Sequence, residues 1–352
     1  MKPPSFDPNA SRLGRRLLDT IERALSSVGL VPSGEVTVTE VPGTDPSAGS
    51  PGAVRPGRVV SHVFSNAAGS RVYRVYRPAA AAGLRPVIVM LHGCTQSAED
   101  FAAGTQMNRL ADRHGFIAVY PEQAPGSNAS KCWNWFSSEN QQRGCGEPSL
   151  IAGITREVIE REGGDPKRVF VAGLSAGGAM AVIMAETYPD LYAAAGVHSG
   201  LPYASAHDVM SALSVMREGV AGEAAFVPAV GARAVPVIVF HGDSDPMVHP
   251  SNGIEIVARA GKAHAAQADV PMLRPVSSRG TSGGGREYTR TVHECNEGHA
   301  RIEAWTLHGA GHAWSGGHAS GSHTDASGPD ASAEMARFFL ALPVDAPAPA
   351  TA

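Results

Sequence analysis

The sequence lacks any long hydrophobic segment. No apolar run approaches the roughly 18 to 20 residues that a helix needs to cross a bilayer. The N-terminus, which begins Met1-Lys2-Pro3-Pro4, has no apolar centre of the kind found in secretory signals. We therefore expect no membrane partner. The chain is then cytoplasmic, or its leader is absent from this sequence, or it is exported by another route.

The sequence also has little net charge. The net charge is −4 and is spread along the chain. The basic residues Arg12, Arg15 and Arg16 form a small cluster, but they lie on a predicted surface helix, where a solvated face is the ordinary interpretation. A nucleic-acid partner would need a basic stripe, so none is expected.

Cysteines are few, and none of them stand in close C-x-x-C pairs. The four are Cys94, Cys132, Cys145 and Cys295, each in or near a predicted loop. The spacing disfavours structural zinc. An even count in glycine- and proline-rich surroundings is typical of two disulfides, for which three connectivities are possible. Disulfides favour an extracellular or periplasmic protein, with a cytoplasmic one as the alternative.

Three parts can be distinguished along the chain. Residues 1–56 combine a helix over about 10–30, with leucine and isoleucine every three or four positions, and a flexible linker rich in glycine and proline. The catalytic domain is predicted over 57–342. Residues 343–352, rich in proline and alanine, are predicted to be a disordered tail.

Within 57–342, apolar strand-like runs alternate with helical patterns. Two strands, 58–65 and 71–77, read as an antiparallel hairpin. Further strands are predicted at 86–91, 116–120, 168–172, 192–197, 235–241 and 302–307, and helices at 98–114, 149–162, 178–185, 254–265 and 331–342. The alternation predicts an α/β fold with a mostly parallel central sheet, helices on both faces and the N-terminal hairpin at an edge.

The most specific motif is Gly173-Leu174-Ser175-Ala176-Gly177, between a predicted strand and a predicted helix. A G-x-S-x-G turn in this position is typical of the nucleophile elbow of α/β-hydrolases. The sharp turn lifts the serine hydroxyl above the sheet. Ser175 is therefore the predicted nucleophile.

A serine hydroxyl needs a base and a carboxylate that orients the base. His312, in the glycine-rich loop after the last predicted strand, is the predicted base, and His308 at the strand end is expected to be structural. The segment His241-Gly242-Asp243-Ser244-Asp245 offers two carboxylates. The pattern H-G-x-x-D-x-x-V selects Asp245, and Asp243 is expected to brace the turn.

An oxyanion hole requires two backbone donors. We predict the N–H groups of Ala176, after the nucleophile, and of Cys94, in the loop that follows the strand 86–91. The residues His92-Gly93 can also be read as a plain strand-terminating turn, and both readings can hold together.

Aromatic and histidine side chains gather in the remaining loops. Trp133, Trp135 and Trp314 are predicted at the catalytic edge, where at least one is expected to contact substrate. Four histidines fall between His308 and His323. That segment has no helix to hold a ligand pair and no spaced acidic partner, so no metal is predicted.

These motifs, with Leu91-His92-Gly93-Cys94-Thr95-Gln96, Cys132-Trp133-Asn134-Trp135-Phe136 and Gly311-His312-Ala313-Trp314-Ser315-Gly316-Gly317, resemble the polyhydroxybutyrate (PHB) depolymerase family of esterases, related to feruloyl and acetylxylan esterases. The resemblance implies an α/β-hydrolase fold, carboxylester hydrolysis and no cofactor. It also implies that Trp135 lines the acyl pocket, and that Cys94 pairs with Cys132 and Cys145 with Cys295.

The sequence thus predicts a monomeric serine esterase that acts on short-chain esters or hydroxyalkanoate oligomers. Feruloyl or acetylxylan esters are the alternative substrates, and an inactive carbohydrate- or polyester-binding protein is the alternative of another class. No polymer-binding domain of the kind found in secreted family members is visible, so soluble esters are expected to react faster than crystalline polymer. Residues 202–234 form a lid or a plain surface excursion.

Overall fold

A computed structural model describes residues 57–79, 83–220, 233–267, 274–294 and 300–343. The predicted N-terminal helix and linker, Cys295 and nearly all of the predicted tail lie outside these ranges.

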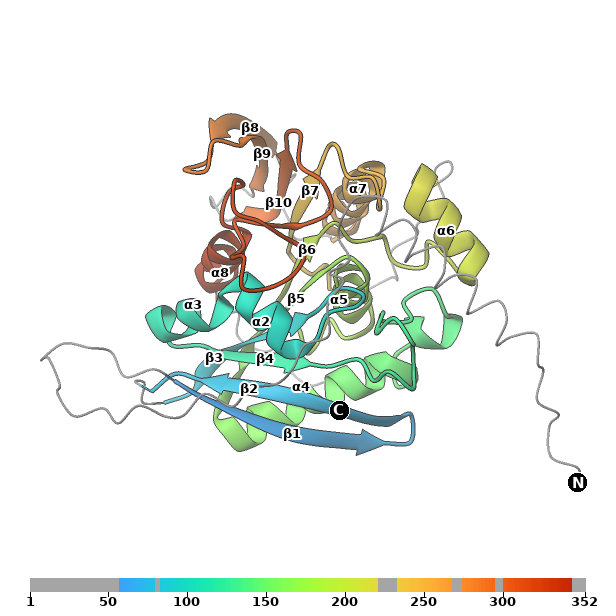
Figure 1. Ribbon diagram of the computed structural model, residues 1–352, viewed down its shortest axis with the longest axis vertical. Helices are drawn as coiled ribbons and strands as arrows, with labels where there is room; N and C mark the ends of the chain where they lie inside the picture. Colours follow the sequence, from blue (N-terminus) through green and yellow to red (C-terminus); the bar gives the residue numbers. More distant parts are fainter. Residues whose placement is uncertain (1–56, 80–82, 221–232, 268–273, 295–299, 344–352) are drawn as a thin grey trace, which may run out of the picture. The chain divides into compact units, whose positions relative to one another are not determined.

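A ten-stranded sheet forms the centre of the described domain, in the order β1-β2-β4-β3-β5-β6-β7-β10-β9-β8 (Figure 1). The six central strands, β4, β3, β5, β6, β7 and β10, run parallel to one another. At one end β2 is antiparallel to β4 and β1 to β2, and at the other end β9 is antiparallel to β10 and β8 to β9. The strands are β1 Arg58–Asn66, β2 Gly69–Arg77, β3 Arg85–Leu91, β4 Ile117–Pro121, β5 Gly164–Leu174, β6 Ala194–His198, β7 Val237–Gly242, β8 Arg274–Thr281, β9 Glu287–Glu294 and β10 Ala300–Leu307.

The predicted hairpin is confirmed. β1 and β2 pair from Arg58 with Arg77 to Asn66 with Gly69. The Asn66 side chain accepts a hydrogen bond from the Ala68 N–H at 2.8 Å, and Gly69 has a φ of 127°, which favours glycine. These two residues close the turn.

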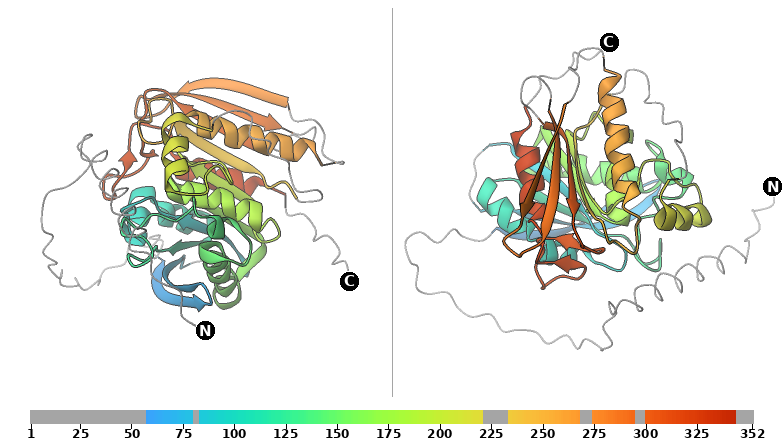
Figure 2. Two further views of the ribbon diagram at one scale, coloured as in Figure 1. Left: turned by 90° about the vertical axis from the view of Figure 1, so that its right-hand side faces the viewer. Right: turned by 90° about the horizontal axis from the view of Figure 1, so that it is seen from above.

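Helices cover both faces of the sheet, as predicted. Figure 2 shows α7 and α8 on opposite sides of the strands. One face buries a core with residues of α4, α5, α6 and α7, and the other buries a second core with residues of α2, α3 and α8. The helices are α2 Ala98–Thr105, α3 Met107–His114, α4 Gly146–Glu162, α5 Ala176–Thr187, α6 Val209–Glu218, α7 Ser251–Ala265 and α8 Ala331–Ala341.

The prediction of one helix over 98–114 is wrong, because the chain breaks at Gln106. This residue is left-handed, with a φ of 54°, and separates α2 from α3. The end of α2 is also a docking point: a Cβ on Gly104 would lie 2.9 Å from Thr324 and 3.4 Å from the backbone of Gly321. The break lets a loop from the C-terminal part of the chain pack against α2.

The sheet is wider than predicted. β8 and β9 form an antiparallel hairpin beside β10 that the sequence analysis did not assign. Most residues of β8 are exposed, so the strand lacks the apolar pattern that marks the central strands. Residues 202–234, predicted to be a lid or a plain surface excursion, contain α6. Their part 221–232 lies outside the described ranges. Among the described residues, no helix has the length and apolar character needed to span a membrane.

Candidate active site

The nucleophile elbow has the backbone strain that its motif predicts. β5 ends at Leu174 and α5 begins at Ala176, and Ser175 between them has a φ of 57° and a ψ of −120°. A Cβ on Gly173 would lie 2.3 Å from the Gly177 carbonyl oxygen, and a Cβ on Gly177 would lie 2.1 Å from that of Leu91. Both glycines are therefore required for strand and helix to pass each other.

Asp245 and His312 form a hydrogen-bonded pair at the same edge of the sheet. The His312 Nδ1 lies 2.7 Å from the Asp245 Oδ2. The other carboxylate oxygen accepts the N–H groups of Met247 and Val248, both at 2.9 Å. The Asp245 side chain is fully buried and that of His312 is 10% exposed. Asp245 thus holds one imidazole nitrogen and leaves the other available.

The charge of Asp245 is stabilised where it lies. Burial alone would raise the pKa of this carboxyl. The charge interaction and hydrogen bond with His312 and the Val248 N–H outweigh burial and leave the pKa well below its usual range. A carboxylate that stays ionised favours the imidazole tautomer with its proton on Nδ1, and Nε2 is then free to accept a proton.

β6 lies between β5 and β7, and its last residue, His198, connects the elbow with the histidine loop. The His198 carbonyl oxygen accepts the Ser175 N–H at 2.9 Å. Its Nε2 accepts the Ser315 N–H at 3.0 Å, three residues after His312. Because β5, β6, β7 and β10 are parallel neighbours, Ser175, Asp245 and His312 all follow strands at one edge of the sheet.

His198 is neutral in the folded protein. Burial, assisted by the nearby His241 and His312, lowers the pKa of its imidazole to about 3. Its ring stacks on Trp314 at 5.3 Å and on Phe240 at 5.9 Å between ring centroids. The sequence analysis missed this residue, because nothing near it in the chain marks it as a contact of a loop more than a hundred residues away.

Asp243 and His308 form a second pair beside the first. The carboxylate accepts the Gly309 N–H at 2.7 Å and lies 2.9 Å from the His308 Nδ1. The His308 Nε2 lies 2.9 Å from the Thr289 hydroxyl. Both ring nitrogens of His308 are engaged, so this pair braces β7, β9 and β10, in agreement with the structural roles predicted for Asp243 and His308.

The two predicted oxyanion donors lie at the ends of neighbouring strands. Cys94 follows β3 and Ala176 follows β5, and these strands pair up to Leu91 with Gly173. Within the described residues, the N–H groups of Cys94 and Ala176 donate no hydrogen bond. The Gly93 carbonyl, in the same peptide as the Cys94 N–H, accepts from the His92 Nδ1 at 2.7 Å. Because a trans peptide is planar, this bond fixes the direction of the Cys94 N–H.

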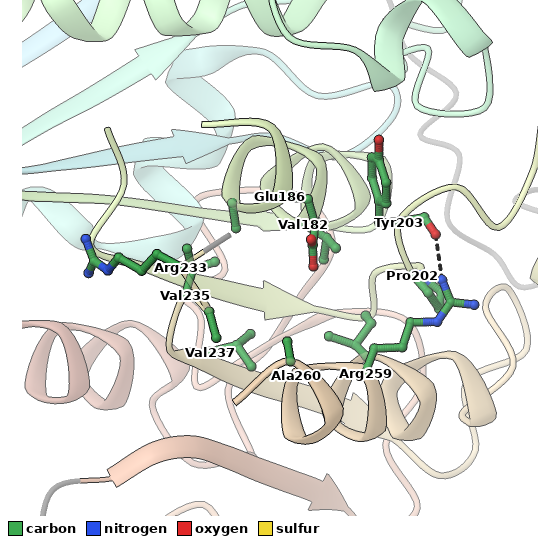
Figure 3. A pocket seen from close by; sticks show the side chains of 14 residues that line it. Val182, Glu186, Pro202, Tyr203, Arg233, Val235, Val237, Arg259 and Ala260 are labelled. Carbon is green, nitrogen blue, oxygen red and sulfur yellow. Dashed lines mark hydrogen bonds between the residues drawn. The ribbon is translucent and has the colours of Figure 1, made fainter. Parts of the chain in front are cut away.

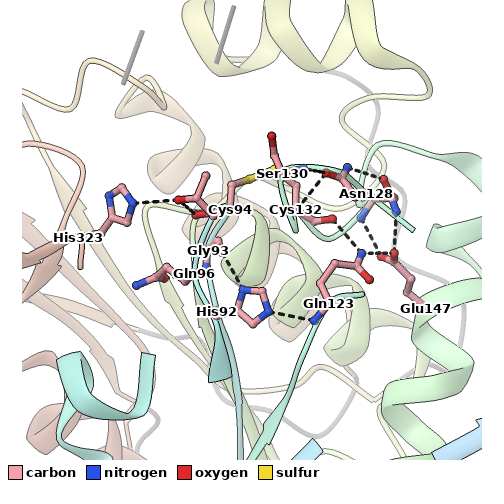
Figure 4. The surroundings of a disulfide bond; sticks show 12 residues. His92, Gly93, Cys94, Gln96, Gln123, Asn128, Ser130, Cys132, Glu147 and His323 are labelled. Carbon is pink, nitrogen blue, oxygen red and sulfur yellow. Dashed lines mark hydrogen bonds between the residues drawn. A yellow bond between two sulfur atoms is a disulfide. The ribbon is translucent and has the colours of Figure 1, made fainter. Parts of the chain in front are cut away.

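His92 acts here as a neutral donor. The Gln123 N–H donates to its Nε2 at 3.0 Å, so the proton of the ring lies on Nδ1. Burial lowers the pKa of His92, which keeps this tautomer uncharged. Figure 4 shows His92 between Gly93 and Gln123.

The disulfide between Cys94 and Cys132 is present, with the two Cα atoms 4.2 Å apart (Figure 4). Beside it, the Thr95 N–H donates to the Ser130 carbonyl at 2.6 Å. The two bonds attach the loop that carries Cys94 to the tryptophan loop. The predicted pairing of these cysteines is confirmed.

The second predicted disulfide does not agree with the structure, in which Cys145 is a free, exposed thiol. Its predicted partner, Cys295, lies outside the described residues and follows β9.

A buried carboxylate holds the tryptophan loop in place. Glu147 at the start of α4 accepts the backbone and side-chain N–H groups of Asn134, both at 2.7 Å, and the side-chain amide of Gln123. Burial raises the pKa of Glu147, although these donors and Arg71 act in the opposite direction. Figure 4 shows Glu147 and Gln123 in this network. No motif in the sequence marks it.

The three tryptophans are buried in the core. Trp133 and Trp314 are 0% and 1% exposed, and Trp135 is 5% exposed. The Trp314 Nε1 donates to Ser332, and its ring packs edge-on against Phe101. Trp135 packs edge-on against Phe136. The predicted substrate contact of these tryptophans stays a prediction, and the structure gives each of them a packing role in the core.

The cavity in Figure 3 lies away from the sheet edge that carries Ser175, Asp245 and His312. Among the described residues, no three histidine, cysteine or acidic side chains are grouped as metal ligands. The cavity, of about 80 Å³, lies between α5 and α7 and is lined by residues such as Val182, Glu186, Val237 and Ile256. It contains none of the predicted catalytic residues.

The chain is similar to known esterases. The family model described as "Esterase PHB depolymerase" matches residues 71–265. Poly(3-hydroxyalkanoate) depolymerase C of Paucimonas lemoignei is 35% identical over 64% of this chain and 54% of that protein. A probable acetylxylan esterase A of Aspergillus fumigatus is 33% identical over 56% of each chain. The chain spans about half the length of these curated relatives.

The fold also has a solved counterpart. The structure of an acetyl xylan esterase from Aspergillus awamori covers 73% of this chain and 94% of its own, with a TM-score of 0.60 and 23% identity. This likeness shows the α/β-hydrolase fold. The family match over residues 71–265, more than half of the chain, shows that the chain belongs to the PHB depolymerase family of esterases.

Proposed function

We propose that this protein is a serine carboxylester hydrolase that works through an acyl-enzyme. The observation that supports this most directly is the 2.7 Å hydrogen bond between His312 and the buried Asp245, at the sheet edge where Ser175 follows β5 in a strained turn. A serine in a strained turn and an imidazole oriented by a carboxylate, both at one edge of the sheet, are the groups that such a mechanism uses to attack a carbonyl.

In the proposed reaction, Ser175 attacks the ester carbonyl and His312 accepts the hydroxyl proton on Nε2. Asp245 stabilises the imidazolium that forms. The N–H groups of Cys94 and Ala176 bind the oxyanion, and His312 then returns the proton to the leaving alcohol. A water molecule, activated by the same histidine, frees the acid and restores the serine.

The proposed catalytic unit is residues 57–342, acting as a monomer. All five groups in this reaction come from one chain, so no second subunit is needed to complete the site. The chemistry as described requires no cofactor, because the charge that develops is on the oxyanion and on the imidazole, and both have protein partners.

The proposed substrates are short-chain esters and hydroxyalkanoate oligomers. This rests on the similarity to the Paucimonas lemoignei depolymerase. Acetylated sugar esters are the second candidate, because the similarity to a probable acetylxylan esterase covers a comparable share of the chain. Feruloyl esters are a further alternative, because the chain is also similar to feruloyl esterase B of Neurospora crassa, with 36% identity over 41% of the chain.

Turnover should be compared on 3-hydroxybutyrate oligomers, acetylated xylan and ethyl ferulate at equal enzyme concentration. A serine-directed phosphonate should abolish turnover with one equivalent bound, and a chelator should leave it unchanged. Loss of activity with the chelator alone would favour metal-dependent hydrolysis. Substrate binding without turnover on any ester would favour the inactive binding protein.

A further inference from the structure

Gln96 is a buried amide in the loop that carries Cys94, and the reaction proposed above gives it no role. Its side chain is 2% exposed. The Oε1 accepts the Gly93 N–H at 2.9 Å, which closes the turn around Cys94. An amide confined to this turn would be a local structural feature, but the Nε2 faces a different part of the chain.

The Gln96 Nε2 donates to the Ser322 carbonyl at 3.1 Å and to the Asp100 Oδ2 at 2.9 Å. Asp100 in turn accepts the Ser322 N–H at 2.8 Å and the Ser322 hydroxyl at 2.5 Å. Gln96 and Asp100 thus hold the backbone of a residue more than two hundred positions away, through both its N–H and its carbonyl.

Ser322 precedes His323, and His323 supports the loop of the proposed base. The His323 carbonyl accepts the Trp314 N–H at 2.7 Å, two residues after His312. A short parallel pairing of β11 Trp314–Ser315 with β12 Thr324–Asp325 continues this contact. The His323 Nε2 also lies 3.4 Å from the Thr95 hydroxyl. Figure 4 shows Gln96 and His323 on the same side of Cys94.

The hydrogen bonds of the Gln96 side chain and of the His323 carbonyl, connected by the Ser322–His323 peptide, therefore join the Gly93 N–H to the segment after His312. We propose that Gln96 is a positioning residue that sets the oxyanion donor of Cys94 relative to the histidine loop. The proposal rests on the proposed esterase reaction. Both segments must keep one relative geometry in the transition state, and a misplacement of about 1 Å can cost about 100-fold in rate.

The test uses the full chain with Gln96→Met, which keeps the length of the side chain and removes all of its hydrogen bonds. Active sites are counted with a fluorescent serine-directed phosphonate, so that kcat is expressed per active site. We expect kcat per active site to fall about 10- to 100-fold while KM changes less than about 3-fold, because the geometry acts on the transition state. A merely structural role would lower the number of active sites or the melting temperature instead.

Charge exchange provides a rescue. Gln96→Glu places a second carboxylate 2.9 Å from Asp100, so its kcat per active site should fall at least as far as that of Gln96→Met. Adding Asp100→Asn restores a donor between the two positions but not the donor to the Ser322 carbonyl, so it should recover part of the loss, about tenfold. If Gln96→Met does not fold, this pair of variants still decides the question.

Gln141→Met is the matched control. Gln141 also joins two segments through backbone carbonyls, those of Trp135 at 2.9 Å and Ala206 at 2.7 Å, without reaching either catalytic loop. Its kcat per active site should stay within about twofold of the parent.

The proposal is overturned if Gln96→Met lowers kcat per active site no more than this control does, or if the whole loss is in KM or in the number of active sites. A parent enzyme that turns over no ester, or an active Ser175→Ala, would instead refute the proposed function itself.

Discussion

Ser175 has a backbone conformation that side-chain-bearing residues rarely adopt, with a φ of 57° and a ψ of −120°. Residues held in such regions cost about 1–3 kcal/mol and persist where the surroundings fix them. Here the Ser175 N–H bonds to His198 and its carbonyl accepts the Ala179 N–H, both at 2.9 Å. The strain is maintained from both sides of the turn.

Ser175→Ala should abolish ester turnover without loss of folding. Because the nucleophile acts as a unit with its base, we expect a loss of about 10⁴- to 10⁶-fold in kcat. Ser175→Gly should be equally inactive but should unfold at the same or a higher temperature than Ser175→Ala, since glycine relieves the strained φ. A folded Ser175→Ala retaining more than about a tenth of the activity would refute the assignment.

Asp245→Asn and Asp243→Asn make the same chemical change two positions apart. Asp245 bonds His312 and is fully buried, so its amide variant should favour the wrong imidazole tautomer and lose about 10⁴-fold in kcat. Asp243 bonds His308 and Gly309, and its variant should keep most of the activity. Steady-state kinetics of both variants decide between them, and the opposite ranking would exchange the two roles.

At this scale the sequence predicted the residues that belong to local motifs. Ser175, Asp245 and His312 each lie in a short pattern with its own signal. His198, Gln96 and Glu147 do not, because each acts through partners distant in the chain that only the folded structure brings together. The tryptophans were placed on the correct loops, but a loop position does not reveal that the ring points into the core.

The elbow as an element depends on the absence of a side chain at Gly177. A Cβ there would lie 2.1 Å from the Leu91 carbonyl and 2.5 Å from that of His92, both backbone atoms that cannot move independently. Gly177→Ala should therefore lower both the melting temperature and the yield of active protein. Gly261→Ala, where a Cβ on α7 meets nothing within 4 Å, is the control and should stabilise by about 1 kcal/mol. Equal melting temperatures for the two variants would contradict this account.

The disulfide connects two elements that are 38 residues apart in the chain. In the chain-entropy model a loop of this size is worth about 4 kcal/mol. The double variant Cys94→Ala with Cys132→Ala should lose about that much in urea unfolding, and its kcat should fall because the Cys94 N–H is less well fixed. Unchanged unfolding would show that the Thr95 N–H bond to Ser130 and the Glu147 network suffice to hold the loop.

Among the elements, the central strands were predictable because their residues are almost all apolar and buried. β8 was not predictable, because its first six residues are exposed and most of its side chains are polar. The division of α2 from α3 depends on the left-handed Gln106 and on a loop that packs against Gly104, which are tertiary effects without a local signal.

For the molecule as a whole, the carboxyl edge of the sheet holds buried, uncharged histidines. His92 follows β3, His198 ends β6 and His241 lies near the end of β7, and burial lowers the pKa of each. Each ring accepts or donates in its neutral form to a backbone partner, at distances of 2.7–3.0 Å. The geometry of the candidate site therefore depends on these groups remaining unprotonated.

Stability should consequently fall on the acid side of about pH 6.5. In the unfolded chain a histidine has a pKa of about 6.5, whereas burial lowers the pKa of His198 to about 3 and also lowers those of His92 and His241. The unfolded state thus binds more protons as the pH falls, and the contribution of a lowered histidine is fully present above about pH 6.5. Below it, each such group costs up to about 1.4 kcal/mol per pH unit. The pKa of Glu147, which burial raises, acts in the opposite direction.

Because opposing groups titrate together, the test follows one histidine. His198→Gln keeps a carbonyl oxygen that can accept the Ser315 N–H but removes the titratable ring. The free energy of unfolding is measured by urea between pH 7.5 and 5, and its slope below pH 6.5 should be smaller in this variant by about 1.4 kcal/mol per pH unit. His207→Gln, on a side chain that is 77% exposed, controls for the glutamine itself. An unchanged slope in His198→Gln would mean that His198 takes up a proton equally in both states, and its buried neutral form would not be what limits stability in acid.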